Sequence, residues 1–236
     1  GQAVLMNNLG VSYLYADDFE KAEEYFNKTR NIYLSIDDTL SAIQVETNLG
    51  IIAYYKGDTT EAIAIYRRTA SVMEKAGNIR SAGNAWSNIA ECYRELGYYD
   101  SAEYYLNKAI EVDIKLEDPE SLGTSYRIKG SINNSKGKYN VARENYLKSL
   151  EIAEEIGRKH DISECYKLMY LNEQDANNFD QALIFHKLYI SYEDSIQLES
   201  NSEILGKVEA ENEFNKQLDV QKAEDEQKIK HKKKKV

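Results

Sequence analysis

Three asparagines recur at intervals of 40 residues, at Asn8, Asn48 and Asn88. A side-chain amide offers two N–H donors and one carbonyl acceptor, so a row of amides matches the N–H and C=O groups of an extended peptide backbone. The alternative is structural, because asparagines at one position of a repeat can also form hydrogen bonds between neighbouring helices. The spacing therefore predicts either a peptide-binding row or a helix-to-helix contact.

Residues that commonly carry catalysis or bind metals are scattered. The histidines His160, His186 and His231 do not have the i, i+3 or i+4 spacing of metal ligands on one helix. Cys92 and Cys165 lie two repeats apart, too far for a disulfide, and are expected as free thiols in or near the core. The many neighbouring carboxylates suit the solvated face of amphipathic helices. We therefore expect no catalytic residue, no metal ligand, no cofactor and no enzyme, with a hydrolase as the most remote alternative.

The composition indicates an all-α protein. Pro119 is the only proline among 236 residues, and a proline inside a helix costs about 3 kcal/mol. Apolar residues make up 42% of the chain and charged residues 30%, which suits a folded core with a charged surface. The sequence shows no apolar run of about 18 residues and no leader-like start, so we expect neither a membrane span nor a signal peptide within it.

A 40-residue repeat organises the chain. One position of the repeat holds alanine in five successive blocks: Ala22, Ala62, Ala102, Ala142 and Ala182. Four residues later, on the same helical face, the side chain is bulky: Phe26, Tyr66, Leu106, Tyr146 and His186. Five residues before each alanine stands a residue type that tolerates positive φ: Asp17, Gly57, Gly97, Gly137 and Asn177. Each block therefore predicts a first helix, a tight turn and a second helix.

The third block shows the pattern most fully, in this order: Trp86, Ile89, Ala90, Tyr93, Gly97, Ala102, Leu106 and Ala109. This pattern resembles the tetratricopeptide repeat, whose first helix has the signature W-x2-L-G-x2-Y. The resemblance implies a right-handed α-α superhelix, in which Gly10, Gly50 and Gly130 let the second helix of a unit approach the first. A unit of 40 residues exceeds the standard 34, so longer helices or loops are expected.

The resemblance also sets the expected boundaries. Five units are predicted over residues 1–40, 41–80, 81–120, 121–160 and 161–195. Residues 196–236 are expected to form a capping helix followed by a polar, lysine-rich tail or linker. Residue 1 coincides with the start of a first helix, so we expect either further chain or a removed signal peptide upstream.

In tetratricopeptide repeat proteins the first helix of each unit lines a concave groove that binds a protein or peptide partner. The resemblance assigns to this groove the following residues: Asn8, Asn48, Asn88, Tyr15, Tyr54, Tyr55, Arg94 and Arg127. Asparagine ladders hold peptides in cargo receptors of the family, which implies the same role here. The lysine and arginine pattern that clamps a C-terminal carboxylate in other members is not reproduced.

Charge is distributed unevenly along the chain. The formal net charge is −10, yet six lysines and no acid lie within residues 228–236. An acidic body disfavours nucleic acid as a partner of the solenoid, because phosphate binding needs a basic face. The lysines themselves suit a nucleic-acid patch, a solvated terminus or, as we favour, the cytoplasmic flank of a membrane span.

The polar stretch after residue 195 resembles the junction that follows a tetratricopeptide array in many bacterial sensors and leads to a membrane span and an output domain. We therefore expect the input region of a bacterial sensor or regulator, and the alternative is a free-standing cytoplasmic scaffold or peptide receptor. Further expectations are a membrane anchor following the chain and a homodimer formed through the C-terminal helix. Periplasmic placement is favoured over cytoplasmic placement, although the lysines argue the other way.

Overall fold

The computed structural model describes residues 1–201, which form ten helices and no strands. This part of the chain confirms the predicted all-α superhelix. None of its helices has both the length and the apolar character needed to cross a membrane. The helices are α1 Gln2–Tyr15, α2 Phe19–Ser35, α3 Thr39–Tyr55, α4 Thr59–Lys75, α5 Ile79–Glu95, α6 Tyr99–Lys115, α7 Pro119–Ser135, α8 Tyr139–Glu155, α9 Lys159–Asp175 and a last helix over 179–201.

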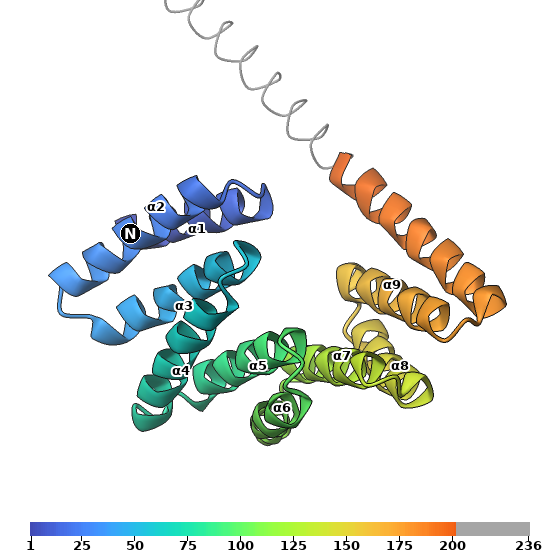
Figure 1. Ribbon diagram of the computed structural model, residues 1–236. Coiled ribbons are helices and arrows are strands. Elements are labelled where there is room, and N and C mark those ends of the chain that lie inside the picture. The colour runs from blue at the N-terminus through green and yellow to red at the C-terminus, as the bar shows by residue number, and fades with distance from the viewer. Residues whose placement is uncertain (202–236) are drawn as a thin grey trace, which may run out of the picture.

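The helices follow one another along an arc (Figure 1). Helices α3, α5, α7 and α9 lie on its inner side, while α4, α6 and α8 lie outside. The inner helices touch one another directly: α5 contacts both α3 and α7, and α7 contacts α9. The last helix continues unbroken past residue 195, where a boundary was predicted. The predicted tail lies in residues 202–236, outside the described residues.

All nine turns have the same length and the same backbone geometry. Each turn has three residues, and the middle one has positive φ: Asp17, Asp37, Gly57, Gly77, Gly97, Glu117, Gly137, Gly157 and Asn177. The sequence predicted the turns within the repeats but missed those between repeats, where the same conformation returns. From α2 to α9 the structural period is therefore a helix of 17 residues followed by a turn of three. The extra length of the 40-residue unit over the standard 34 lies in its helices, since the turns are short.

Close contact between a glycine on the first helix and a ring on the second holds three of the hairpins together. A Cβ atom added at Gly130 would lie 2.4 Å from the Tyr146 ring, and one added at Gly50 would lie 2.6 Å from the Tyr66 ring. The predicted role of these glycines is confirmed, since neither site has room for a methyl group. In the third repeat the second helix carries Leu106, which is smaller than the rings of the other repeats. The first helix therefore has room for the methyl group of Ala90.

The alanine column marks the second close contact. Its five members are buried: Ala22, Ala62, Ala102, Ala142 and Ala182. The bulky column is buried in the first four repeats, whereas His186 in the fifth is only half-buried and packs against Tyr170, with ring centroids 4.8 Å apart. Tyr170 stands where other repeats have glycine or alanine, so this hairpin exchanges the ring-on-glycine contact for a contact between two rings.

We predict that Gly130→Ala destabilises the fold by about 1–3 kcal/mol, because the new methyl group overlaps the Tyr146 ring. Gly123→Ala is the matched control on the same helix, since its added Cβ would meet Ile152 at an ordinary 3.4 Å. Alanine is the better helix former by up to about 1 kcal/mol, so the control should be neutral or stabilising. Urea unfolding measures both variants, and equal stability would show that the ring does not set this spacing.

One joint between hairpins is polar where its counterparts are apolar. The Ser125 hydroxyl on α7 donates to Asp113 on α6 at 2.7 Å, and both side chains are buried. At the preceding joint, Met73 and Ala85 occupy the corresponding places in a core cluster. Burial raises the pKa of the Asp113 carboxyl above its ordinary value, although Ser125 and the Arg80 charge oppose this shift.

The raised pKa of Asp113 makes a testable contribution to stability. Because the folded state binds its proton more tightly, Asp113 lowers the free energy of unfolding as the pH rises through its folded pKa. We expect Asp113→Asn to raise the unfolding temperature at pH 7 and to lose this advantage below about pH 4, where the acid is protonated in both states. Glu111→Gln, an exposed change on the same helix, is the control. Destabilisation at pH 7 would contradict the assignment.

Candidate functional site

Two adjoining hollows lie along the first helices of the repeats. The larger has a volume of about 510 Å³ and is called the aromatic hollow, after its three tyrosines. Its lining comes from α3 (Ile51, Tyr54, Tyr55), α4 (Tyr66), α5 (Asn88, Glu91, Cys92), α7 (Arg127, Ile128, Ser131) and α9 (Glu164, Leu168). Four successive first helices therefore contribute to one surface, which is the arrangement that a solenoid groove requires.

Packing with neighbouring rings positions two of the tyrosines. Tyr55 stacks on Phe19 of α2 with centroids 5.8 Å apart, and Tyr54 meets the Tyr55 ring edge-on at 5.7 Å. Burial, followed by the nearby Glu91 charge, raises the pKa of the Tyr54 phenol, so the hydroxyl stays neutral. Burial likewise raises the pKa of the Cys92 thiol to about 12, so Cys92 acts as a small apolar wall rather than as a nucleophile.

Each charged side chain lining the aromatic hollow already has a partner of opposite sign. Two N–H groups of Arg94 donate to the Glu91 carboxylate, at 3.0 and 2.6 Å. Arg127 donates to Asp161 at 2.8 Å, and Glu164 pairs with the next-turn Lys167 at 3.3 Å. The hollow therefore offers a ligand apolar and amide contacts rather than unpaired charge.

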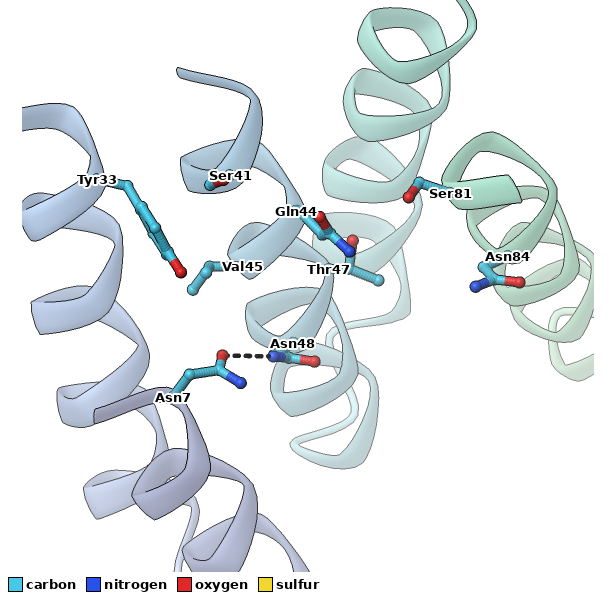
Figure 2. A pocket seen from close by; sticks show the side chains of 9 residues that line it. All are labelled: Asn7, Tyr33, Ser41, Gln44, Val45, Thr47, Asn48, Ser81 and Asn84. Atoms are coloured by element: carbon cyan, nitrogen blue, oxygen red, sulfur yellow. Dashed lines mark hydrogen bonds between the residues drawn. The ribbon is translucent and has the colours of Figure 1, made fainter. Parts of the chain in front are cut away.

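The second hollow lies beside the first and measures about 340 Å³. It is called the uncharged hollow, because amides, hydroxyls and one valine line it: Asn7, Tyr33, Ser41, Gln44, Val45, Thr47, Asn48, Ser81 and Asn84. Figure 2 shows these side chains turned toward a common space from separate helices. The Asn48 amide donates to the Asn7 carbonyl at 3.5 Å, a long hydrogen bond between α3 and α1.

The predicted site residues divide into three groups. The aromatic hollow brings together Tyr54, Tyr55, Asn88 and Arg127, and the uncharged hollow holds Asn48. The remaining three line neither hollow: Asn8, Tyr15 and Arg94. Asn8 and Tyr15 are exposed, and Arg94 is paired with Glu91. The structural alternative for the asparagines applies in part to Asn48 alone, through its long bond to Asn7.

Sequence reasoning missed several lining residues, although a signal for them was present. Ser41, Gln44 and Asn48 are spaced i, i+3 and i+7, so they lie on one face of α3. Ser81, Asn84 and Asn88 repeat that spacing on α5. Tyr66 and Cys92, which also line the aromatic hollow, carried no such signal, because both belong to columns that pack inside the hairpins.

Two tetratricopeptide repeat family models match most of this chain. One matches residues 1–75 and again 39–115, and the other matches residues 124–156. The chain belongs to the tetratricopeptide repeat family. Proteins with this repeat are generally non-catalytic scaffolds for protein interactions, and this chain has the same scaffold. In residues 1–201, no group of three or more His, Cys, Asp or Glu side chains is placed to hold a metal ion.

Solved structures show the same fold at low sequence identity. This tetratricopeptide repeat chain superposes on a Rap protein complexed with Competence and Sporulation Factor with a TM-score of 0.75 and 15% identity, covering 84% of this chain and 56% of that one. The superposition on BtubC (BKLC) from P. vanneervenii has a TM-score of 0.62 and 16% identity, and it covers 81% of this chain and 80% of that one.

A signal-transduction ATPase from Pyrococcus horikoshii, described as having a tetratricopeptide repeat sensor, gives a TM-score of 0.62 and 20% identity, covering 82% of this chain and 30% of that one. No curated protein sequence matches the chain. The likeness to these solved structures establishes the fold.

Proposed function

We propose that the chain is a non-enzymatic scaffold that binds an extended peptide or protein segment in the groove formed by α3, α5, α7 and α9. The aromatic hollow carries this proposal. It joins four first helices, its charges are paired internally, and Asn88 adds an amide to a lining rich in tyrosine and aliphatic side chains. An apolar ligand side chain can displace water from such a lining, while the amide bonds to the ligand backbone.

Asn48 extends the same binding surface toward α1. Its side chain is half-buried, and its one hydrogen bond is at the long limit, so its amide can still bond to a ligand. The Rap protein of similar fold was solved with Competence and Sporulation Factor bound, which supports a ligand-binding role for an array of this shape. The proposed site residues are therefore Asn48, Asn88, Tyr54, Tyr55 and Arg127.

A random peptide library selected on the purified chain supplies the probe for this proposal. We predict that Asn48→Ala combined with Asn88→Ala weakens binding of the selected peptide by about 1–3 kcal/mol, because hydrogen bonds to the ligand are left unmade. Asn107→Ala combined with Asn140→Ala is the matched control, since both asparagines are exposed on outer helices. Titration calorimetry measures the affinities and circular dichroism the helix content. Unchanged affinity in the groove variant would reject the proposal.

We further propose that this binding region is the input part of a bacterial sensor or regulator. Two observations support it: the polar stretch after residue 195 resembles the junction in such proteins, and a solved protein of this fold is described as having a tetratricopeptide repeat sensor. The alternative is a free-standing scaffold. The gene sequence past Val236 separates them, since an apolar run of about 20 residues supports the sensor and a stop codon supports the scaffold.

A further inference from the structure

The uncharged hollow is unusual for a chain in which 30% of the residues are charged. None of its nine lining residues carries a charge, although they come from α1, α2, α3 and α5. Four of them are amides and four are hydroxyls, so nearly every lining side chain can form hydrogen bonds. Figure 2 shows these groups on both sides of the open space.

Two of the helices that line this hollow, α1 and α3, are themselves nearly free of charge. Helix α1 contains no charged residue, and Glu46 is the only one in α3. Glu46 is buried away from the hollow and accepts a hydrogen bond from Arg68 of α4 at 2.9 Å. Asp38, just before α3, caps the helix by accepting from the backbone N–H of Ser41. The side of these helices that lines the hollow therefore presents no charged group.

Such a surface discriminates between ligands by what it lacks. A charged ligand side chain that enters the hollow loses hydration and finds no opposite charge, which is unfavourable. A peptide group or a neutral side chain exchanges its water for amide and hydroxyl partners at little cost. Val45 and the Tyr33 ring add apolar wall that suits small aliphatic groups.

The two hollows are close enough to share one ligand. Asn48 and Ile51 lie about one turn apart on α3 but line different hollows, as do Asn84 and Asn88 on α5. An extended chain advances about 3.3 Å per residue, and packed helices lie about 8–10 Å apart, so about three ligand residues span one helix. A short segment can therefore occupy both hollows.

We propose that the uncharged hollow selects an uncharged stretch of extended peptide, with small neutral side chains, while the aromatic hollow takes an apolar side chain of the same ligand. This inference rests on the proposed function and adds the class of ligand to it. Selectivity arises in the first three repeats, from Gln44 on α3, Asn84 on α5 and their hydroxyl neighbours.

The test compares peptides selected from one random library by the wild-type chain and by Gln44→Glu combined with Asn84→Asp, changes that keep shape and add charge. Wild-type peptides should contain a run without Asp, Glu, Lys or Arg next to an apolar or aromatic position. The variant should select lysine or arginine within that run. It should also bind the wild-type peptide on the order of tenfold more weakly and recover affinity when one residue of the run is changed to lysine.

The matched control is Asn107→Asp combined with Asn140→Asp, which adds the same charge on outer helices and should leave the selection unchanged. The inference would be overturned if charged residues were spread evenly through the wild-type peptides. It would also be overturned if the Gln44→Glu, Asn84→Asp variant selected the same peptides as the wild type. If peptide binding still depends on Asn88 and Tyr54 in that case, the proposed function holds and only the inference about the class of ligand fails. A wild-type chain that selects no peptide overturns both.

Discussion

The approach of the two helices within each hairpin is the contact on which the rest of the structure depends. In the first, second and fourth hairpins the second helix carries a buried ring and the first helix carries only a hydrogen atom opposite it, as at Gly50 and Gly130. Where the ring becomes Leu106, the partner grows to Ala90. Because the sum of the two sizes changes little, four successive hairpins keep one geometry, and their first helices reach the inner side of the arc in register.

Uniform turns convert this hairpin geometry into one continuous inner surface, which is the surface that we propose binds ligand. Three-residue turns with one left-handed residue join every helix to the next within residues 1–201, so residues 40 positions apart lie side by side on neighbouring first helices. The amides of Asn48 and Asn88 thus become parts of adjoining hollows. Function in this architecture depends on side chains that the packing leaves free, since the backbone is nearly the same in every repeat.

The sequence predicted most of the features that recur in several repeats, but not the turns between repeats. The alanine column and the turns within repeats could be found because they recur in five copies, and the glycine contacts because they recur in three. Features that occur once could not be found in this way. The Asp113–Ser125 bond replaces an apolar contact at a single joint, and Tyr66 lines the groove while also packing in its hairpin. The position of Arg94 in the repeat predicted that it lines the groove, but its guanidinium forms an ion pair with Glu91.

We propose that ligand binds on the inner side of the arc. Amide hydrogen exchange of the full chain, with and without a peptide selected on it, tests this most directly, because binding slows local opening of the helices it covers. This binding mode predicts increased protection in α3, α5 and α7, with little change in the outer helices α6 and α8. Protection confined to α6 and α8, with α3 and α5 unchanged, would contradict it.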